Sequence, residues 1–577
     1  MGECVVRGKD KPLYAVREIK DLKDMLEQSV KIYGDKPAFY VKTEAGKDYK
    51  PISYKQFKQD VEALGTELMD LGLKGKRIAI IGENRYEWAV SYLAIVNGIG
   101  IVVPLDKDLP VHELENLLNV SEASGIFFSG KYEKDIINIC KGLPQVKTLI
   151  SMERNTGNKN IHCIYDLIDK GRKKTEAGDK RFINEPINAE EMSILLFTSG
   201  TTGLAKGVML SQKNICTNLM AMCQMVYIDE KDIFLSVLPI HHTYECTCGF
   251  LAPIYRGCTI AYCEGLRHIV KNLKESKATM MLGVPLLFES MYKKIWQQAE
   301  KSGMASKLKF AIKINKFLNI LGIDLSKKLF SKIHDNFGGH IRLFISGGAG
   351  IDPLVSKGFR ELGIHMVQGY GLTECSPIAA LNRDCYFKDD AAGLPLPGME
   401  VKIHNPDADG IGEIICKGDN VMLGYYQNDA ETRKVLKDGW FYTGDLGFID
   451  KDGFVHITGR QKNVIVTKNG KNIFPEEVEA YLGRSKYIAE SLVWGKYDEK
   501  SGETYVNAQI VPDFEAVTEV LGENYAEQDL YKLIQNEVRE VNHKMPLYKR
   551  IADFTIRKEE FQKTTTRKIK RYMEKLQ

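Results

Sequence analysis

Short apolar runs alternate with helical patterns between residues 77 and 128, and this alternation restricts the fold more than any other feature of the chain. Residues 77–82, 101–104 and 126–128 are apolar and too short for helices, so they predict buried strands. Residues 86–97 and 114–120 lie between them and predict helices. Strands that alternate with helices pair in parallel and are covered on both faces. We therefore expect an α/β fold with a mainly parallel sheet.

The remaining chain predicts further subdomains. Before the first strand, Phe57, Val61, Leu64, Leu68 and Leu71 predict one face of a helix that Gly72 closes. A mostly helical insertion is expected at 301–336. Further strands are expected in the body and in a small β subdomain, at 194–197, 259–262, 280–284, 341–345, 401–403 and 412–416.

The C-terminal part predicts a smaller α+β domain. Pro475 suits the first turn of a helix, where Glu476 and Glu477 lie near the positive end of the helix dipole. Strands at 491–494 and 505–511 and a helix at 529–541 are expected to follow. We predict a large multi-subdomain body over residues 1–461 and a small mobile domain over residues 462–577.

Composition excludes several functional classes. The chain of 577 residues carries 80 basic and 76 acidic side chains, a net charge of +4, which gives no reason to expect nucleic-acid binding. Its 12 cysteines contain no CxxC pair, so reduced, mostly buried thiols are expected rather than a zinc cluster. The N-terminus lacks the apolar core of a signal peptide, and residues 88–105 suit a helix and a buried strand better than a membrane span. A cytoplasmic location is expected, and a peripheral membrane contact is left open.

Residues 197–207, FTSGTTGLAKG, are the sharpest local signal for chemistry. Glycines let backbone N–H groups converge on an anion, hydroxyls donate to phosphate oxygens, and a lysine adds positive charge. The spacing is not that of a P-loop, and a plain turn between two strands is the alternative reading. The candidate phosphate-binding residues are Thr198, Ser199, Gly200, Thr201, Thr202, Gly203 and Lys206.

This segment resembles the signature loop of the adenylate-forming superfamily, in which it holds the triphosphate of ATP. Further family motifs follow in the family order, over roughly residues 50–571. Residues 368–374, QGYGLTE, resemble the next block, with Gln368, Gly369 and Gly371 around Tyr370. The resemblance implies that Tyr370 stacks on adenine, that Thr373 contacts the α-phosphate and the acyl carboxylate, and that Glu374 coordinates Mg²⁺. A loop tyrosine with a solvated glutamate is the alternative.

Three more segments resemble nucleotide-binding and hinge motifs of that family. Residues 346–350, SGGAG, are similar to the adenine-edge loop, with Gly348 and Ala349 as contacts and Gly350 where the family usually has proline. The resemblance assigns Asp445 in YTGDL and Arg460 in GRQK to the ribose hydroxyls. Lys462 falls at the hinge position between the two domains.

Two loops of the C-terminal part resemble the family's catalytic and CoA-step segments. Gly470 lies in GKNIFPEE, which is similar to the loop that lines the CoA tunnel. Residues 561–571, FQKTTTRKIKR, resemble the motif that carries the catalytic lysine, here Lys568. Gln562 replaces the usual proline and Arg567 the usual glycine, which puts the backbone path of that loop in question.

Residues 238–245, LPIHHTYE, resemble a block of long- and medium-chain fatty acyl-CoA synthetases, where His242 would lie beside the acyl and pantetheine paths. The resemblance implies an ATP-dependent carboxylic acid:CoA ligase that forms an acyl-AMP and then a thioester, and releases AMP and pyrophosphate. ATP, Mg²⁺ and coenzyme A would be its cofactors, with Lys568, Thr373, Glu374 and His242 as the catalytic residues. Transfer to a carrier protein, an aryl or steroid acid as substrate, and a non-catalytic nucleotide-binding relative are alternatives.

Overall fold

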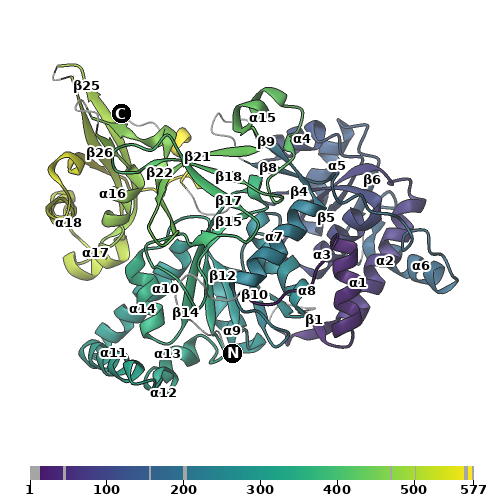
Figure 1. Cartoon of the computed structure of the whole chain (residues 1–577), viewed down its shortest axis with the longest axis horizontal. Coiled ribbons are helices and arrows are strands. Elements are labelled where there is room, and N and C mark those ends of the chain that lie inside the picture. Colours follow the sequence, from purple (N-terminus) through teal and green to yellow (C-terminus); the bar gives the residue numbers. More distant parts are fainter. Residues whose placement is uncertain are drawn as a thin grey trace. The chain divides into compact units, whose positions relative to one another are not determined.

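The computed structural model describes residues 13–42, 47–154, 157–198, 205–467, 471–500, 502–563 and 569–574 (Figure 1). Contacts within the chain group it into two compact units. The large unit takes in the described residues up to 400 and residues 416–441, and the small unit takes in residues 401–415 and those from 442 onward. The boundary predicted at residue 461 separates a fixed body from a segment that rotates. A grouping by contacts does not test such a rotation, so this boundary stays a prediction.

The first sheet of the large unit has eight strands in the order β19-β9-β8-β4-β3-β5-β6-β7. Its six strands from β8 to β7 pair in parallel, whereas β9 and β19 are antiparallel to their neighbours. The strands are β3 (Lys76–Ile81), β4 (Gly100–Leu105), β5 (Gly125–Phe128), β6 (Thr148–Ser151), β7 (His162–Cys163), β8 (Met192–Thr198), β9 (Lys206–Ser211) and β19 (Gly424–Tyr425).

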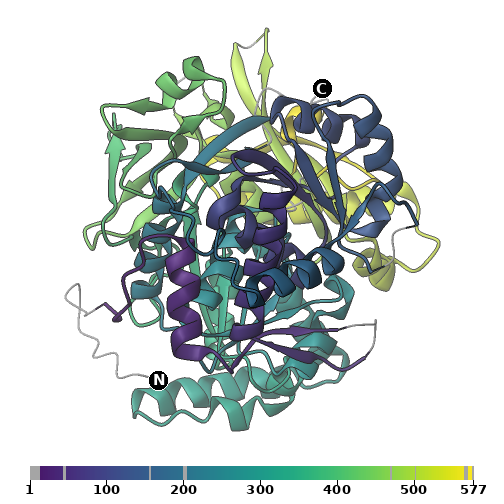
Figure 2. The same cartoon turned by 90° about the vertical axis from the view of Figure 1, so that its right-hand side faces the viewer.

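Both faces of this sheet are covered. The four residues from Ile78 to Ile81 are at most 1% exposed, and successive strand residues point to opposite faces. Ala79 and Ile81 share one core with Leu114 and Leu117 of a covering helix. The purple helices α1 and α2 of this region face the viewer in Figure 2. The helices are α1 (Leu22–Tyr33), α2 (Tyr54–Asp70), α3 (Tyr86–Ala94), α4 (Val111–Val120), α5 (Glu133–Lys141) and α6 (Ile164–Glu176).

The helix expected at residues 86–97 changes its winding before it ends. The α-helix α3 stops at Ala94 and continues as the π-helix η2 (Ile95–Ile99). Gly100 then begins β4, and a Cβ there would lie 2.1 Å from the carbonyl oxygen of Lys76 on β3. Glycine therefore lets the chain turn from helix into the neighbouring strand without a clash. The parallel α/β arrangement predicted for this region is confirmed.

The second sheet has nine strands in the order β16-β15-β14-β13-β12-β10-β11-β1-β2. The six strands from β14 to β1 pair in parallel, and the edge strands β15, β16 and β2 are antiparallel. The strands are β1 (Pro37–Val41), β2 (Lys50–Ser53), β10 (Ile233–Ser236), β11 (Thr259–Tyr262), β12 (Met280–Gly283), β13 (Leu343–Ser346), β14 (His365–Gly371), β15 (Ile378–Leu381) and β16 (Leu394–Pro395).

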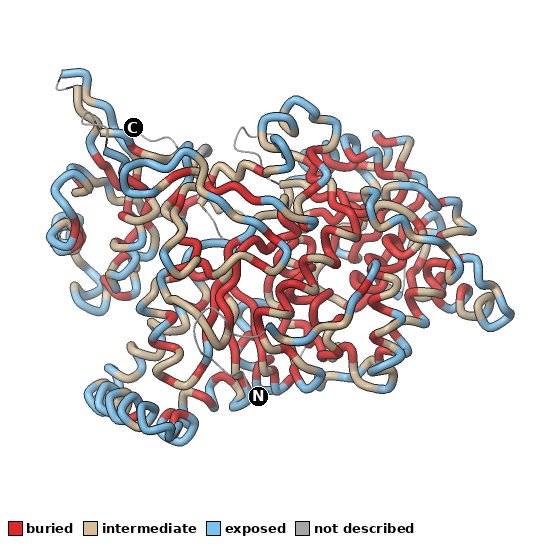
Figure 3. Tube along the Cα trace, in the orientation of Figure 1, coloured by how far each residue is buried: buried red, intermediate tan, exposed pale blue. Residues whose placement is uncertain are grey.

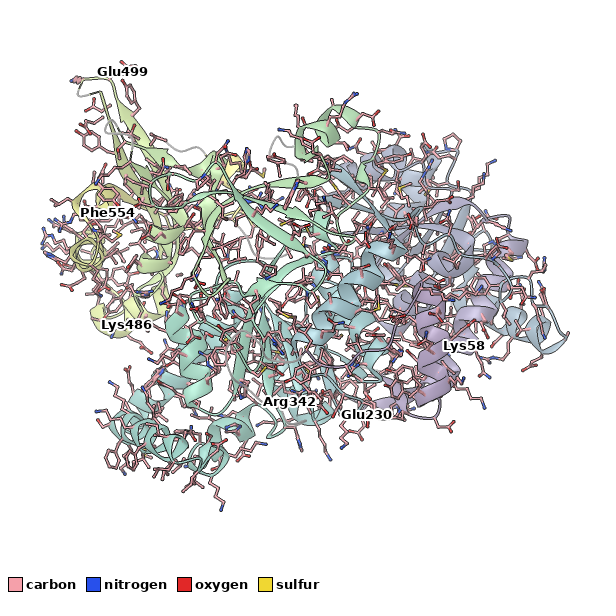
Figure 4. All side chains as sticks on the ribbon, viewed as in Figure 1. Lys58, Glu230, Arg342, Lys486, Glu499 and Phe554 are labelled. Carbon is pink, nitrogen blue, oxygen red and sulfur yellow. The ribbon has the colours of Figure 1, made fainter. Side chains whose placement is uncertain are left out.

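An ion pair between the half-buried Arg342 and the buried Asp232 joins the amino-terminal ends of these parallel strands. Arg342, labelled in Figure 4, precedes β13, and its Nε donates to Asp232 Oδ1 at 2.8 Å. Thr279, which precedes β12, donates its hydroxyl to the same oxygen at 2.8 Å. The opposite, carboxyl-terminal edge of the sheet carries the candidate site.

Helices surround the second sheet and also form the predicted insertion. The covering helices are α7 (Gln212–Met225), α8 (Ala252–Arg256), α9 (Ile269–Ser276), α10 (Pro285–Lys301) and α14 (Pro353–Glu361). The insertion is helical, as expected, and consists of α11 (Ala305–Ile320), α12 (Ser326–Leu329) and α13 (Ser331–Asn336). The burial colours of Figure 3 place the buried residues among the two sheets and show the insertion largely exposed.

A five-stranded sheet follows, in the order β17-β18-β21-β20, with β22 also paired to β21. It corresponds to the predicted β subdomain. Its strands are β17 (Glu400–His404), β18 (Gly412–Lys417), β20 (Leu436–Lys437), β21 (Trp440–Ile449) and β22 (Val455–Arg460). The helix α15 (Asp429–Val435) precedes β20.

The end of the small unit has the expected α+β composition. A sheet of β25 (Ile488–Asp498), β26 (Glu503–Pro512) and β27 (Ile551–Ile556) is antiparallel at its first pairing and parallel at its second. Residues of this sheet share one core with α16 (Pro475–Leu482), α17 (Phe514–Leu521) and α18 (Glu527–His543). Pro475 occupies the first turn of its helix, as predicted.

The described residues include 11 cysteines, which are all free thiols and mostly buried. No group of three or more metal-ligating side chains gathers in the parts of the chain that the structure describes. Across those same ranges no helix is long and apolar enough to cross a membrane.

Candidate functional site

The candidate site of the large unit lies where parallel strands of the second sheet end. In the register of these strands, Gly283 pairs with Ser346, and Ser346 pairs with Gln368. The segment 238–245 follows the neighbouring strand β10. Ligands of open α/β sheets bind outside the carboxyl ends of the strands. Three motifs that are far apart in the sequence thus meet at one edge.

The ring of Tyr244 lies against Gly347, the first glycine of the SGGAG loop. Its hydroxyl donates to the carbonyl oxygen of Ile345 at 3.0 Å. A Cβ on Gly347 would lie 2.7 Å from the Tyr244 ring, so only glycine fits beside it. Gly348 has φ +85°, in the left-handed region that favours glycine, and both Gly348 and Ala349 are exposed. The predicted adenine-edge loop therefore presents accessible backbone.

The glycines on both sides of Tyr370 lie where the neighbouring strand β15 comes close to β14. A Cβ on Gly371 would lie 2.1 Å from the Pro377 carbonyl oxygen, and one on Gly369 would lie 3.0 Å from the Leu381 side chain. Here β14 has the parallel strand β13 on one side and the antiparallel strand β15 on the other. Tyr370 itself is 9% exposed. The close approach of β15 therefore requires glycine at residue 371 and leaves little room for a side chain at residue 369.

Gln368 supports the same edge from within β14. Its side-chain oxygen accepts from the backbone N–H of Ile351 at 3.3 Å, and its Nε2 donates to the carbonyl oxygen of Asp389 at 2.8 Å. Both side-chain ends of this buried residue are thus paired within the protein. The structure gives Gln368 a role in holding the loop that begins at residue 347.

Thr373 and the LPIHHTYE segment lie side by side. The hydroxyl oxygens of Thr243 and Thr373 are 3.3 Å apart, within hydrogen-bond distance. His242 Nδ1 accepts from the backbone N–H of Tyr244 at 3.3 Å, which places the proton of a neutral ring on Nε2. His242 is half-buried. The structure thus brings Thr373 next to the segment that carries His242, although nothing in their sequence spacing required it.

Asn84 and Ser236 hold this segment in place. Asn84 Nδ2 donates to Ser236 Oγ at 2.8 Å and to the carbonyl oxygen of Leu238 at 2.6 Å. Ser236 Oγ in turn donates to Oε1 of the buried Glu245 at 2.5 Å. Burial raises the pKa of Glu245 to about 8, so this side chain is mostly protonated at neutral pH. Glu245 lies in the π-helix η4 (Tyr244–Leu251), a winding that often marks functional sites.

Glu374 and Lys206 contact one common side chain, Tyr425. The Tyr425 hydroxyl donates to Glu374 Oε1 at 2.8 Å, and Lys206 Nζ lies 5.1 Å from the centre of the tyrosine ring. The pairing of β19 with β9 brings Tyr425 here, opposite Val208. Tyr425 lies in residues 424–436, GYYQNDAETRKVL, and was not among the site residues expected from the sequence.

Lys206 has a second partner that the sequence did not single out. Its Nζ donates to Glu431 Oε2 at 2.7 Å. Hydrogen bonds from Lys206 and Lys434 lower the pKa of Glu431 to about 2. Thr198 pairs with Lys206 across the hairpin of β8 and β9. The structure therefore describes both ends of the predicted phosphate loop, while Ser199, Gly200, Thr201, Thr202 and Gly203 lie outside the described residues.

In the small unit, the two residues assigned to the ribose form an ion pair. Asp445 and Arg460 are register partners on β21 and β22, and Arg460 Nε lies 2.8 Å from Asp445 Oδ1. The Asp445 side chain is 7% exposed and that of Arg460 is 44% exposed. Gly444 precedes Asp445 with φ +70°, and its N–H donates to Glu413 Oε1 at 2.9 Å. The turn thus fixes the carboxylate that the sequence singled out.

Lys462 lies two residues beyond this pair, in the 3₁₀ turn η7 (Gln461–Asn463). Its pKa lies below the ordinary value, because its ammonium is partly desolvated and because Arg460 and Arg571 add positive charge nearby. The next residue, Asn463, donates to Glu476 Oε1 at 2.7 Å in the first turn of α16. The segment after Lys462 is therefore tied to that helix.

Lys568 and Gly470 lie outside the described residues, as does Arg567, but the segments that flank them are described. Lys563 and Ile569 form a β-bridge across the Lys568 loop, and Ile569 packs on a small core with Phe561. The N–H of Gln562 donates to Glu574 Oε1 at 3.3 Å, a bond that the family's usual proline could not make. The hairpin of β23 (Ile465–Val466) and β24 (Asn472–Ile473) flanks the Gly470 segment.

Comparison with solved structures places this architecture in a known class. The anthranilate CoA ligase AuaEII in complex with anthranoyl-AMP matches with a TM-score of 0.75 and 20% identity, over 98% of each chain. The o-succinylbenzoate CoA synthetase MenE of Bacillus subtilis, in complex with ATP and magnesium, matches with a TM-score of 0.72 and 20% identity, over 95% of this chain and 98% of that one. The fold is that of the adenylate-forming enzymes.

The chain belongs to the AMP-binding enzyme family, whose sequence model matches residues 26–426. Fatty acyl-CoA synthetase B of Dictyostelium discoideum is 28% identical, over 90% of this chain and 81% of that protein. Long-chain-fatty-acid–CoA ligase 1 of Cavia porcellus is 28% identical, over 88% of this chain and 76% of that protein. The superfamily inferred from the motifs is confirmed.

Proposed function

We propose that this protein is an ATP-dependent carboxylic acid:CoA ligase for medium- or long-chain fatty acids. It forms an acyl-AMP, passes the acyl group to CoA, and releases pyrophosphate and AMP. The observation that carries this assignment is the contact between two motifs, in which Thr243 Oγ1 lies 3.3 Å from Thr373 Oγ1. It supports the proposal because Thr243 is next to His242, in the segment proposed to bind the acid, and Thr373 belongs to the proposed nucleotide motif around Tyr370. The names of the relatives from Dictyostelium and Cavia favour a fatty acid.

The first half-reaction activates a poor electrophile. A carboxylate oxygen attacks the α-phosphorus of ATP, the bond from that phosphorus to the bridging oxygen breaks, and pyrophosphate leaves. Thr373 would donate to the α-phosphate, and Lys568 would neutralise charge that develops on the phosphoryl oxygens. The loop from Thr198 to Lys206 would hold the triphosphate with hydroxyl and backbone donors.

Glu374 is suited to hold Mg²⁺. Its carboxylate is the hard oxygen donor that this ion prefers, and the Tyr425 hydroxyl on Oε1 is the kind of outer hydrogen bond that orients a metal ligand. When bound, Mg²⁺ would supply positive charge against the phosphate oxygens. Tyr425 fixes the direction of the carboxylate before the nucleotide arrives.

Separate motifs would hold the base and the ribose of the nucleoside. Tyr370 would stack on adenine. The adenine edge would meet the backbone of the loop around Gly348 and Ala349, which Gln368 supports from β14. Gly369 and Gly371 keep β14 close to β15. Asp445 would accept from the ribose hydroxyls while Arg460 neutralises its charge.

The second half-reaction transfers the acyl group to sulfur. The CoA thiolate attacks the acyl carbonyl carbon, and AMP leaves with the electron pair of the broken carbon–oxygen bond. We propose that the segment beyond residue 461 rotates about Lys462 between the two half-reactions. That rotation would withdraw Lys568 and bring the Gly470 loop to the CoA path.

A pyrophosphate-release assay with octanoate, palmitate and benzoate tests this proposal, with acyl-CoA followed by mass. Release that depends on the aliphatic acids and on CoA is expected. Benzoate as the preferred acid would place the chain with aryl acid ligases. Acyl-AMP that is transferred to a pantetheinylated carrier protein but not to CoA would reassign the acceptor. No release with any acid would favour a non-catalytic nucleotide-binding protein.

A further inference from the structure

Helix α11 carries an apolar stripe on its outer surface. Phe310, Ile314, Phe317 and Leu321 are spaced four, three and four residues apart, which places them on one side of the helix. Phe310 is 65% exposed, Phe317 63% and Leu321 60%. Ile320, at the end of the helix, is 78% exposed. We call the outward surface formed by Phe310, Ile314, Phe317, Ile320, Leu321 and Ile323 the α11 face.

The opposite side of α11 packs on the protein, so the α11 face is not the core side of the helix. Asn315 is 1% exposed, and its Nδ2 donates to Ser326 Oγ at 2.9 Å. Leu308, Ile312 and Leu318 are partly buried on that side. Figure 1 shows α11 at the periphery of the large unit, and the tube of the same region is largely pale blue in Figure 3. One side of the helix thus holds the fold and the other meets solvent.

Lysines flank the α11 face, and no acidic side chain lies within it. Residues 301–323 contain five lysines and no aspartate or glutamate, a charge of +5. The whole chain carries +4, so the remainder of the chain sums to −1. Lys307 and Lys313 lie on either side of the stripe, and with Lys309 and Lys316 they are exposed. The exposed aromatic stripe therefore lies in a segment that is strongly positive, although the chain as a whole is nearly neutral.

We propose that the α11 face docks on an anionic lipid bilayer, with the helix lying in the plane of the interface. Apolar side chains on one side of such a helix enter the boundary between headgroups and acyl chains, while lysines reach back to the headgroups. Anionic lipids attract lysines near the surface. The cores of protein–protein interfaces are instead depleted of lysine, which disfavours a protein partner.

The docking would bring the enzyme to a substrate that partitions into membranes, and this benefit rests on the proposed fatty acid specificity. The docking itself does not, because the stripe and its lysines would bind lipid whatever acid the enzyme activates. Vesicle binding is therefore measured without ATP, acid or CoA. Failure of the docking and failure of the proposed function are then separate results.

The test is co-sedimentation of the full chain with sucrose-loaded vesicles. One set contains phosphatidylcholine alone, and the other contains phosphatidylcholine with phosphatidylglycerol. We expect binding to the anionic vesicles that weakens as salt is added, because salt screens the lysines. Equal binding to both vesicle types, or no binding to either, would overturn the proposal.

Two pairs of substitutions locate the binding surface. Phe310→Ser/Phe317→Ser removes apolar area, and Lys307→Glu/Lys313→Glu reverses charge. Each pair should weaken the partition coefficient by roughly tenfold or more. The matched controls, Ile32→Ser/Val111→Ser and Lys170→Glu/Lys173→Glu, change exposed residues of other helices and should retain wild-type binding. Wild-type binding by both α11 pairs would show that another surface carries it.

Two further measurements separate lipid docking from other occupants of the α11 face. Unchanged melting temperatures for the variants exclude unfolding as the cause of lost binding. Sedimentation velocity of the wild type without vesicles reports self-association. A wild-type dimer that Phe310→Ser/Phe317→Ser converts to a monomer would assign the α11 face to a second copy of the chain and overturn the lipid assignment.

Discussion

The Tyr425 hydroxyl donates to Glu374 Oε1 at 2.8 Å, and the same tyrosine ring lies 5.1 Å from Lys206 Nζ. One side chain thus joins the proposed metal ligand to the proposed phosphate loop. The two motifs are separated by more than 160 residues in the sequence. The antiparallel addition of β19 to β9 creates this link.

Loss of that hydroxyl should weaken the metal site without unfolding the protein. Tyr425→Phe is expected to raise the Mg²⁺ concentration needed for half-maximal turnover by roughly tenfold, the usual cost of losing an outer hydrogen bond to a metal ligand. Glu374→Gln should have a larger effect in the same direction. Tyr426→Phe is the matched control. The role of Tyr425 is refuted if its variant keeps the wild-type Mg²⁺ dependence.

Lys568 should serve only the first half-reaction. Lys568→Ala is expected to slow acyl-AMP formation by roughly two to three orders of magnitude, comparable to the loss of one transition-state donor. Thioester formation from supplied acyl-AMP should be nearly intact. Both steps are followed by single-turnover quench, with Lys570→Ala as the control. An equal loss in both half-reactions would contradict the assignment.

Lys462 tests the alternation of the two half-reactions. Lys462→Pro fixes φ near −65° and removes an N–H, so the chain should hold one orientation but not reach the other. Acyl-AMP should then accumulate on the enzyme while transfer to CoA falls far more. Lys462→Ala keeps the backbone free and should transfer at close to the wild-type rate. Wild-type acyl-CoA formation by the proline variant would place the hinge elsewhere.

Glu245 should make the protein less stable as the pH rises. Its pKa in the folded protein is about 8, against an ordinary 4.5, so between these values the folded state keeps a proton that the unfolded chain has lost. The stabilising contribution is complete below the ordinary pKa and is lost as the pH approaches 8, by a few kcal/mol in order of magnitude.

Urea unfolding at several pH values measures this effect. Glu245→Gln should flatten the decline in the free energy of unfolding between acidic and mildly basic pH, because the amide does not titrate. Glu300→Gln, an exposed carboxylate on α10, is the control and should retain the decline. A decline that persists unchanged in Glu245→Gln would show that another group causes it.

Local patterns determined most of the secondary structure. Apolar residues that recur every three or four positions, and short apolar runs, predicted α2, α3, α18 and the parallel strands from β3 to β5. These patterns follow directly from which faces of a helix or strand must be buried. The change from α-helix to π-helix at the end of α3 was not predicted. The π-helical turn ends at Ile99, directly before Gly100, whose close approach to Lys76 on β3 exists only once the two strands pair.

The same division holds at the candidate site. The sequence alone singled out Thr373, Glu374, Asp445 and Lys206, because each lies in a short contiguous motif that can be recognised without knowledge of the fold. Only the tertiary structure decided that the hydroxyl of Thr373 contacts that of Thr243 and that the Tyr425 hydroxyl donates to Glu374. It also decided that Gly371 lies too close to the Pro377 carbonyl oxygen for any side chain. These contacts depend on strand order and register, which arise when distant segments share one sheet. The same holds for α11. The sequence gives the helical spacing of its apolar stripe, whereas the burial of Asn315 in the folded protein decided which side of the helix faces solvent.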